Sequence, residues 1–337
     1  MISKNKNNFN LDEKIFIAGG NGMVGSSILR ELKSRGYGNQ KNGGVIHSPS
    51  SQKLNLLNYQ EVDDWFATHK PTIVILAAAK VGGIFANNYH PTEFILNNLK
   101  IQTNTIELAW KHKVKRLLFL GSSCIYPKFA KQPIKEEYLL EGALEPTNQW
   151  YAVAKISGLK LCQALRIEHG FDAISLMPTN LYGPGDNYHE KNSHVMAALI
   201  KKFSDASYKK LKYVQCWGTG SPLREFMHVD DLANAALYVL ENWNPNEKNS
   251  PKDENGEKLY FLNVGTGLDI SIKELAKKIA KYTEFKGEII WDLSKPDGTP
   301  KKQLDVSKIG ELGWQPNISL DEGIRMTIKM YQEENFK

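Results

Sequence analysis

The alternation of short apolar segments with longer amphipathic ones constrains the fold more than any other feature of the chain. Residues 15–18, 45–46, 72–77 and 116–120 have the length and composition of buried strands. The amphipathic segments between them predict helices over residues 23–35, 58–69 and 92–112. Such alternation is typical of βαβ units, whose strands form a parallel sheet covered by helices on both faces. Because crossovers are right-handed, the sequence predicts an α/β fold with a doubly wound parallel sheet.

The second half of the chain is punctuated by glycine and proline, in strings such as LYGPGDN, WGTGSP and KPDGTP. We expect a flexible leader over residues 1–14 and a dinucleotide-binding domain over 15–180, which also includes parts of 210–265. Residues 181–337 should mainly form a smaller C-terminal α/β lobe that binds the substrate. The polar stretch 242–258 is interpreted as an exposed surface loop. In doubly wound folds ligands bind at the carboxyl ends of the strands, so a cleft between the lobes is the expected site.

Composition and charge exclude several classes of protein. Of the 337 residues, 41% are apolar and 24% are charged, which excludes a disordered or fibrous chain. The longest apolar run, Ile73–Ala79, is too short to cross a membrane. The net charge of +6 is too small to imply nucleic acid but suits an anionic small substrate.

The cysteine pattern bears on metals and on the compartment. Cys124, Cys162 and Cys216 are far apart and form no CxxC pair, so neither a disulfide framework nor a metal site is expected. The first residues lack the apolar core of a secretory signal. We therefore predict a cytoplasmic protein with no membrane or nucleic-acid partner.

A glycine-rich segment lies between the first predicted strand and the first predicted helix. It consists of Gly19, Gly20, Asn21, Gly22, Met23, Val24 and Gly25. Its glycines permit a tight turn and close approach of a pyrophosphate, and the helix N-terminus supplies N–H groups and a positive dipole end. A glycine triplet alone can be a structural turn, but this position in the first βαβ unit indicates a Rossmann-like dinucleotide site.

The second predicted strand ends without the acidic residue that usually binds the ribose 2′-hydroxyl of NAD. It ends instead in His47, Ser48, Pro49 and Ser50. Without a carboxylate there is no repulsion toward a 2′-phosphate, and the hydroxyls with a nearby histidine could bind one, which favours NADP(H). Asn55 could reach the adenine or could simply cap a helix.

Tyr151 and Lys155 stand four residues apart, a spacing that places two side chains on one face of a helix. A neighbouring positive charge favours the phenolate, which makes such a tyrosine a proton donor and acceptor near neutral pH. The YxxxK pattern occurs four times in this chain, but only at Tyr151 does it begin a long predicted helix. Only this copy also follows a predicted strand ending in hydroxyl residues.

Together these features resemble the extended short-chain dehydrogenase/reductase family. The resemblance rests on the glycine loop, on a strand ending in Ser122, and on YxxxK about thirty residues later. Within that family the chain is similar to enzymes that epimerise and reduce GDP-linked 4-keto sugars. It shares with them the strings LAAAKVGGI, LFLGSSCIYPK, MPTNLYGP, WGTGSPLREF and SKPDGTP, which cover nearly the whole chain.

The resemblance implies a reductase triad of Ser122, Tyr151 and Lys155. Ser122 would bind the sugar C4 carbonyl and Tyr151 would deliver a proton to it. Lys155 would lower the pKa of Tyr151 and hold the nicotinamide ribose. Ser122 is preferred to Ser123 because it stands four residues before Tyr126, as the family's catalytic serine does.

Epimerisation needs two acid/base groups on opposite faces of the sugar. In an extended chain Ser122 and Cys124 project to the same side, so Cys124 should face the same sugar and act as a base. His194 is the second acid/base residue by resemblance, although a histidine at the start of a helix is more often a cap or surface residue. Cys162 and Cys216 are interpreted as small buried side chains.

The remaining contacts are implied by resemblance. Nicotinamide and cofactor contacts would come from Ala77, Ala78, Ala79, Lys155, Pro178, Thr179, Asn180, Leu181 and His194. The GDP-sugar would be bound by Lys202, Trp217, Arg224 and Asp297. The sequence departs from the family where arginines usually hold the 2′-phosphate, since Asn21 and the HSPSS stretch occupy those places.

The expected activity is NADPH-dependent 3,5-epimerisation and 4-reduction of GDP-4-keto-6-deoxy-D-mannose to GDP-L-fucose. The alternatives are a related enzyme that makes GDP-colitose or a GDP-6-deoxy-heptose, a sugar 4,6-dehydratase, and a non-enzymatic NADP sensor. The dehydratases use an Asp-Glu pair where this chain has Ser123-Cys124, and sensors typically lose the tyrosine of YxxxK. A homodimer through a four-helix interface, formed by helices over 92–112 and 151–168, is also expected.

Overall fold

A sheet of six parallel strands forms the centre of the structure, in the order β2-β1-β3-β4-β5-β9. The computed structural model describes residues 9–190, 193–295 and 297–336. The strands are β1 Lys14–Ala18, β2 Val45–His47, β3 Ile73–Leu76, β4 Arg116–Leu120, β5 Ala173–Pro178 and β9 Phe261–Val264. The strand order reverses between β1 and β3, which is where a doubly wound sheet opens a crevice for a ligand.

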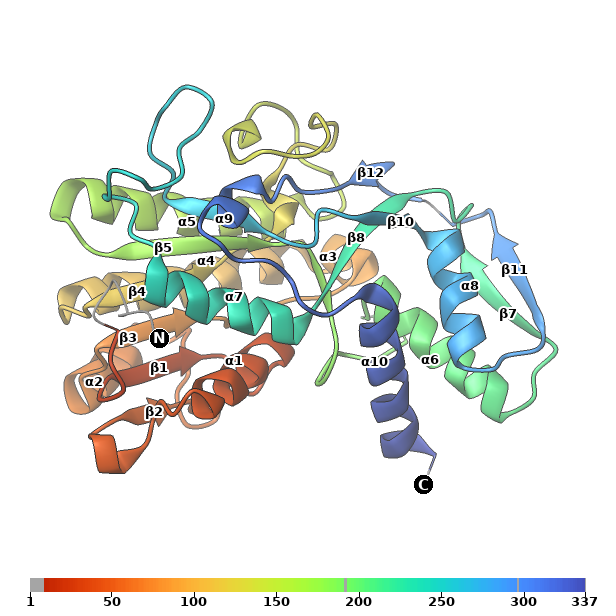
Figure 1. The fold of residues 1–337 in the computed structure, drawn as a ribbon, viewed down its shortest axis with the longest axis horizontal. Helices are drawn as coiled ribbons and strands as arrows, with labels where there is room; N and C mark the ends of the chain where they lie inside the picture. The colour runs from red at the N-terminus through yellow and green to blue at the C-terminus, as the bar shows by residue number, and fades with distance from the viewer. Residues whose placement is uncertain (1–8, 191–192, 296, 337) are drawn as a thin grey trace.

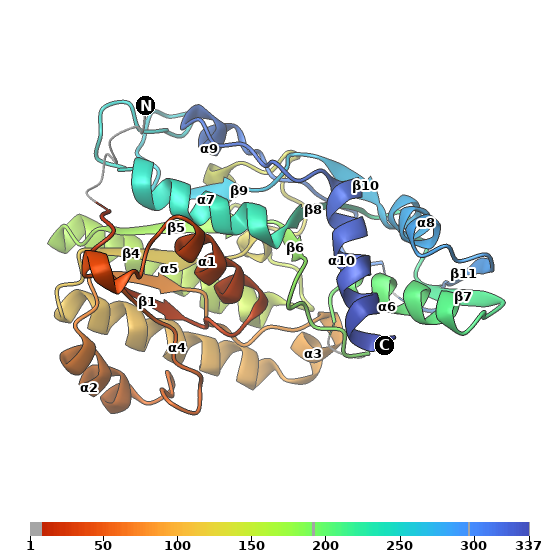
Figure 2. The same cartoon turned by 60° about the horizontal axis from the view of Figure 1, so that its bottom comes forward.

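Helices cover both faces of this sheet, as Figure 2 shows. On one face α1 (Met23–Ser34) packs against α7 (Val229–Asn242). On the other face α4 (Pro91–Lys111) lies between α2 (Tyr59–His69) and α5 (Gln149–His169). Strand β1 shows why both faces need cover, because Ile15 and Ile17 join one hydrophobic core and Phe16 and Ala18 join the other. The prediction of a doubly wound parallel sheet is confirmed.

A smaller lobe contains the remaining strands and lies beside the carboxyl ends of the large sheet (Figure 1). Strand β8 (Leu223–His228) pairs in parallel with β6 (Asn180–Tyr182) and β12 (Lys301–Lys302), and antiparallel with β10 (Asp269–Ser271). A separate parallel pair is formed by β7 and β11. These two strands span Tyr213–Trp217 and Glu288–Asp292.

Three helices of the smaller lobe enclose a third hydrophobic core. They are α6 (Val195–Tyr208), α8 (Ile272–Tyr282) and α10 (Leu320–Asn335). Helix α8 begins with a capping box in which Ser271 and Glu274 satisfy each other's backbone N–H groups. Two short helices, α3 (Ile84–Tyr89) and α9 (Ser307–Glu311), complete the named helices.

The structure corrects two details of the sequence-based expectations. The helix that carries the YxxxK motif begins at Gln149, so Tyr151 lies within its first turn and does not open it. The stretch 242–258 is largely loop, but Trp243 is fully buried and its indole N–H donates to Ser250 Oγ at 3.0 Å. A single tryptophan therefore anchors one end of an otherwise polar loop.

The described residues also bear on membranes and on metals. None of the described helices has the length and apolar character needed to span a membrane. Among the same residues there is no cluster of three or more His, Cys, Asp or Glu side chains with the geometry of a metal site.

Candidate active site

The glycine loop forms a cradle that only glycines allow. Gly19 has φ +88°, and a Cβ added there would lie 2.7 Å from the backbone nitrogen of Ala78. At Gly25 an added Cβ would lie 2.2 Å from the Gly19 carbonyl oxygen. Gly22 caps α1 and donates its N–H to that same oxygen at 3.1 Å. The loop therefore turns tightly into the helix N-terminus, as a bound pyrophosphate requires.

The end of β2 lies directly beside this loop. A Cβ at Gly20 would meet the Cβ of Ser48 at 2.5 Å, so the hydroxyl residues after the strand adjoin the cradle. His47 does not contribute there, because its imidazole packs against the rings of Trp65 and His69, with centroids 5.6 and 4.9 Å away. Of the hydroxyl residues after β2, Ser48 is the one that adjoins the loop, exposed Asn21 is nearby in sequence, and His47 packs against α2.

Asn55 has a local role in the structure. Its side-chain oxygen accepts the N–H of Leu57 at 3.1 Å, and the cap of α2 is provided by Asn58. Asn55 is exposed, and no contact in the structure directs it toward the glycine loop. Its assignment to the adenine stays a prediction.

The small residues after β3 lie next to the glycine loop. Ala77 donates its N–H to the Ala18 carbonyl at 3.0 Å, and Ala78 is the residue against which Gly19 packs. Ala79 follows them, partly buried, and Lys80 is held by the buried side chain of Asn98 through both its N–H and its carbonyl. The structure therefore brings Ala77–Ala79 to the cofactor cradle.

The segment after β5 links the large sheet to the smaller lobe. Pro178 ends β5, and the side chains of Thr179 and Asn180 both donate to the Glu225 carbonyl of β8, at 3.2 and 2.8 Å. Leu181 lies in β6, partly buried, and contacts one of the cores of the large sheet. Because these side chains hold the lobes together, any nicotinamide contact from Thr179 and Asn180 would come from the backbone.

Ser122, Tyr151 and Lys155 meet at the carboxyl end of β4. Ser122 follows the strand in extended conformation, and its hydroxyl is hydrogen-bonded to the phenol of Tyr151. Lys155, one helical turn after Tyr151, donates to the Leu120 carbonyl at 2.8 Å and lies 5.7 Å from the Tyr151 ring centroid. The three predicted reductase residues therefore share one small volume.

Burial dominates the electrostatics of this group. Burial raises the pKa of Tyr151 above its ordinary value, a charge on Cys124 raises it further, and the Ser122 hydrogen bond opposes this. Burial also lowers the pKa of Lys155 to about 7. The ammonium of Lys155 is desolvated and donates to the Leu120 carbonyl, so burial is the main influence on the pKa of Tyr151 in this structure. That Lys155 favours the phenolate stays a prediction.

Cys124 reaches the site by a turn. Residues 123–125 form a 3₁₀ turn in which the Cys124 N–H donates to Ser122 Oγ at 3.2 Å, so the expected extended chain is wrong here. The thiol nevertheless faces the site, since charge on Cys124 acts on both Tyr151 and Arg224. Its sulfur accepts from Lys302 Nζ at 3.5 Å and from Asn148 Nδ2 at 3.6 Å.

His194 is the N-cap residue of α6 and precedes the helix. Its imidazole keeps accessible surface, yet the surrounding protein is close enough for burial to lower its pKa. The positive charge of Lys302, whose ammonium also contacts the Cys124 sulfur, lowers that pKa further. The assignment of His194 as the second acid/base residue stays a prediction.

The predicted sugar-nucleotide residues come from several elements: Trp217 ends β7, Arg224 lies in β8, Lys202 lies in α6, and Asp297 lies between β11 and β12. Trp217 is 57% exposed, and the ammonium groups of Lys202 and Lys295 lie 5.6 and 5.7 Å from its ring centroid. Asp297 accepts the N–H and the hydroxyl of Thr219, both at 2.8 Å, so its carboxylate braces the turn after Trp217.

Arg224 lies in β8. Burial lowers the pKa of its guanidinium, and negative charges on Cys124 and Asp297 oppose this. Its assignment to the GDP-sugar stays a prediction.

Sequence reasoning missed the residues that line the cleft beside Cys124. They include Lys128, Glu145, Asn148, Thr299 and Lys302. Asn148 stands one turn before Tyr151 and could have been found from that spacing. Lys302 carried no local signal, because its place depends on the pairing of β12 with β8.

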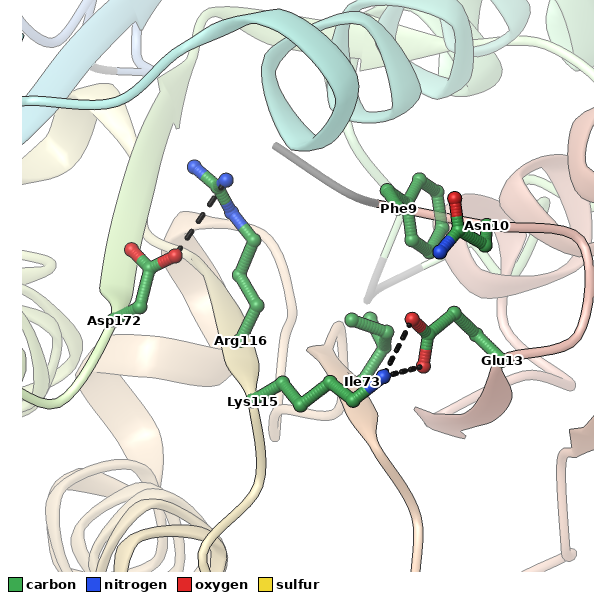
Figure 3. Close-up of a pocket in the computed structure, with 7 residues that line it drawn as sticks. All are labelled: Phe9, Asn10, Glu13, Ile73, Lys115, Arg116 and Asp172. Carbon is green, nitrogen blue, oxygen red and sulfur yellow. Dashed lines mark hydrogen bonds and ion pairs between the residues drawn. The ribbon is translucent and has the colours of Figure 1, made fainter. Parts of the chain in front are cut away.

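A larger cavity of about 460 Å³ lies at the opposite edge of the sheet, at the amino ends of β1, β3, β4 and β5 (Figure 3). Its charged groups are paired with one another, since Lys115 Nζ binds the Glu13 carboxylate at 3.0 Å and Arg116 lies 3.5 Å from Asp172. Parallel sheets bind ligands at their carboxyl edge, so this cavity is separate from the candidate active site.

The fold and the site define the class of protein: a dinucleotide-binding α/β protein with a Ser-Tyr-Lys group at the carboxyl edge of its sheet. Residues 15–252 match the NAD dependent epimerase/dehydratase family, and the chain belongs to that family. The resemblance to extended short-chain dehydrogenases/reductases is therefore confirmed.

Relatives named for their enzymatic activity match almost the whole chain. The protein is 52% identical to "Putative GDP-L-fucose synthase 2" of Arabidopsis thaliana, over 95% of this chain and 92% of the relative. It is 48% identical to GDP-L-fucose synthase of Escherichia coli (strain K12), over 95% of this chain and 97% of the relative.

Solved structures agree in fold. A GDP-mannoheptose C4 reductase from Campylobacter jejuni with NADP bound superposes with a TM-score of 0.83 at 35% identity, over 96% of this chain and 99% of that one.

Proposed function

We propose that the protein converts GDP-4-keto-6-deoxy-D-mannose to GDP-L-fucose in one site, by epimerisation at C3 and C5 followed by NADPH-dependent reduction at C4. The observation that carries the proposal is the meeting of Cys124 with the Ser122–Tyr151 hydrogen bond. A reductase needs only the Ser-Tyr-Lys group, whereas a thiol beside it, with His194 facing the same cation, adds the means to move protons on carbon. Identity of about 50% to GDP-L-fucose synthases supports the same reaction.

The epimerase half uses the acidity that the C4 ketone confers on its two neighbouring carbons. The Cys124 thiolate takes the proton from carbon, so the C–H bond breaks, the S–H bond forms, and the electron pair moves onto O4 as an enolate. His194 returns a proton to the opposite face of that carbon, and the enolate reverts to the ketone. Before the second cycle the thiol releases its proton to solvent and His194 takes one up, and two such cycles invert C3 and C5.

The reductase half uses the group at the end of β4. The residues of the glycine cradle and of the Ala77–Ala79 segment would hold NADPH, which when bound supplies a hydride to C4. Ser122 orients O4, and Tyr151 transfers its phenolic proton to that oxygen as negative charge develops there. Lys155, whose buried ammonium has a pKa of about 7, is placed one turn away to stabilise the phenolate that remains.

The choice of NADP(H) as cofactor is supported by the shape of the glycine loop and by the lack of an acidic residue in the HSPSS stretch after β2. Serine hydroxyls beside Gly20 can donate to a 2′-phosphate, and no carboxylate in the HSPSS stretch repels it. The NADP-bound relative supports the same choice.

The protein is proposed to act as a homodimer through α4 and α5. These helices pack side by side, and apolar side chains lie on their outer surfaces, with exposures of 44% at Leu96, 38% at Trp150, 39% at Val153 and 70% at Ile167. A second copy of this pair would cover them as a four-helix bundle. Sedimentation velocity should give the mass of a dimer, and Val153→Arg should shift it toward the monomer; a wild-type monomer at micromolar concentration would contradict the interface.

A cytoplasmic location is proposed from the free thiols. All three cysteines are unpaired in the structure, and Cys124 must be reduced to act as a base.

The rival activity is reduction of another GDP-4-keto sugar. The structural relative that acts on a mannoheptose favours a heptose substrate, which differs beyond C5. Purified protein should be given NADPH with GDP-4-keto-6-deoxy-D-mannose, with its 3-deoxy analogue and with a GDP-4-keto-heptose, and each product identified by NMR. GDP-L-fucose as the most rapidly formed product supports the proposal, whereas preference for either other sugar or no NADPH oxidation contradicts it.

A further inference from the structure

The two lysines of β12 have different electrostatic surroundings. Lys301 Nζ lies 3.1 Å from the Asp269 carboxylate and is thereby neutralised. Lys302 Nζ points the other way and donates to Cys124 Sγ at 3.5 Å. Among the ion pairs of the described residues, none involves Lys302. Its charge is therefore directed at a thiol.

The backbone around Lys302 is held on both sides, so this contact is built into the fold. Strand β12 pairs with β8 in a register that places Lys302 beside Arg224. The next two residues are fixed by side chains, since Gln303 donates its N–H to Gln132 Oε1 at 2.9 Å and Leu304 donates to the buried Glu225 carboxylate at 2.8 Å.

Other charged and titratable groups surround the thiol from every element packed around it. A charge on Cys124 raises the pKa values of Arg224 in β8 and Tyr151 in α5, and the charge of Lys302 lowers the pKa of His194. Glu145 and Lys128 line the same cleft and lie 3.8 Å from each other, so their charges largely cancel. Lys302 is the cation that hydrogen-bonds the sulfur itself.

We propose that Lys302 is the positioning residue of the epimerase half, holding the Cys124 side chain as a thiolate so that it can take a proton from carbon at neutral pH. An ammonium within hydrogen-bond distance stabilises the charged form of an acid. The same charge lowers the pKa of His194, which eases release of its proton to carbon, and the lysine itself neither gains nor loses a proton in the step. The role deepens the proposed function and rests on it.

The test measures the thiolate directly. Because the thiolate and not the thiol reacts with alkylating agents, the rate of Cys124 modification by iodoacetamide follows the thiolate fraction. Iodoacetamide is uncharged, so removing a lysine does not change its attraction to the site. Modification should be followed from pH 5.5 to 9.5 by mass spectrometry of the Cys124 peptide, while Cys162 and Cys216, which are 2% and 1% exposed, serve as internal controls.

Lys302→Met should slow Cys124 alkylation about tenfold at pH 7, because the ammonium that hydrogen-bonds the sulfur is lost. Lys302→Arg should stay near the wild-type profile because the charge is kept. Lys301→Met is the matched control, since it removes the neighbouring lysine that Asp269 neutralises, and its profile should not move. Identical profiles for wild type and both variants carrying Met would overturn the proposal.

A second measurement separates this proposal from the proposed function. Lys302→Met should slow deuterium incorporation into the sugar from D2O more than it slows NADPH oxidation with substrate that is already epimerised. A higher KM with an unchanged alkylation profile would assign Lys302 to substrate binding and overturn the proposal. If wild-type protein exchanged no deuterium while the alkylation profile still depended on Lys302, the proposed function would fail and the electrostatic role would stand. Where Lys302→Met fails to fold by circular dichroism, Lys302→Gln replaces it.

Discussion

The two halves of the active site are positioned by different kinds of structure. In the reductase half, Ser122, Tyr151 and Lys155 come from one strand end and one helix, within 34 residues of chain. In the epimerase half, Cys124, His194 and Lys302 come from a turn, the cap of another helix and a two-residue strand of the smaller lobe. The first half depends on local rules of strand and helix, and the second depends on how the two lobes are joined.

The burial of the two halves differs as well. Lys155 is 3% exposed, and burial sets the pKa values of both Lys155 and Tyr151. Cys124 is partly exposed, and its sulfur has two specific neighbours, Lys302 and Asn148. In the proposed mechanism, proton transfer to oxygen depends mainly on desolvation, whereas proton removal from carbon depends on the charge of Lys302. Variants that touch only one half should therefore affect only one reaction.

The largest effect is expected for Tyr151→Phe. Loss of a general acid typically costs about 10²- to 10⁴-fold in rate, so NADPH oxidation should fall by about 10³. Deuterium exchange into C3 and C5 should stay within a few-fold of wild type, because Cys124 and His194 are untouched. Stopped-flow absorbance at 340 nm and NMR in D2O measure the two reactions. Loss of exchange in a folded variant would show that the halves are not separable.

Cys124→Ser is the reciprocal change, with a smaller effect. A serine hydroxyl is a far weaker acid than a thiol, so exchange should fall by at least about 100-fold. Binding of NADPH should be unchanged, since the contacts of the sulfur are Lys302 and Asn148 and neither belongs to the glycine cradle. Fluorescence titration with NADPH gives the control. Retained exchange would remove Cys124 from the mechanism.

The third prediction concerns the cradle on which the reductase half depends. Gly25→Ala would put a methyl group 2.2 Å from the Gly19 carbonyl oxygen, so the loop must shift, at a cost of about 1–3 kcal/mol in stability. NADPH affinity should fall about tenfold or more. Gly22→Ala is the matched control, because there the methyl would lie at an ordinary 3.5 Å from the same oxygen and φ is −79°. Equal effects of the two substitutions would show that the cradle geometry is not what holds the cofactor.

The same contrast explains what could be predicted from the sequence. The parallel sheet, the glycine loop and the pairing of Tyr151 with Lys155 follow from periodicity and i, i+4 spacing, whereas Ser122 joined that group through the family resemblance. The reason given for Cys124 was wrong, since the chain after Ser122 forms a turn and is not extended, and its role as a base stays a prediction. Lys302 could not be predicted, because its position requires a register between β12 and β8, whose paired residues are 78 positions apart in the chain. The direction of the Tyr151 pKa could not be predicted from spacing. Spacing reveals the neighbouring Lys155, but it does not reveal the burial of the phenol, which raises that pKa.

The smallest expected effect on catalysis comes from a change to the contacts that join the two lobes. Asn263 of β9 donates its side-chain N–H groups to the carbonyls of Ile134 and Asp305, and so ties the large sheet to the segment that follows Lys302. Glu136 completes the joint by accepting the Asn263 backbone N–H at 2.8 Å. Burial of Glu136 raises its pKa to about 8.

A raised pKa in the folded state has a definite sign in stability. Below the ordinary pKa of about 4.5 both states hold the proton, and the contribution of Glu136 is fully present. As the pH rises toward 8 the unfolded chain releases that proton and the folded chain keeps it, so the free energy of unfolding falls by up to about 1.4 kcal/mol per pH unit. Glu136→Gln should flatten this fall, and urea unfolding followed by circular dichroism at pH 5, 6, 7 and 8 measures it. The exposed Glu141→Gln is the control and should follow wild type. If the free energy of unfolding changed with pH in the same way for Glu136→Gln and wild type, protonation of Glu136 would not affect the contacts between the lobes. The contact between Lys302 and Cys124 should then stay unchanged across the same pH range.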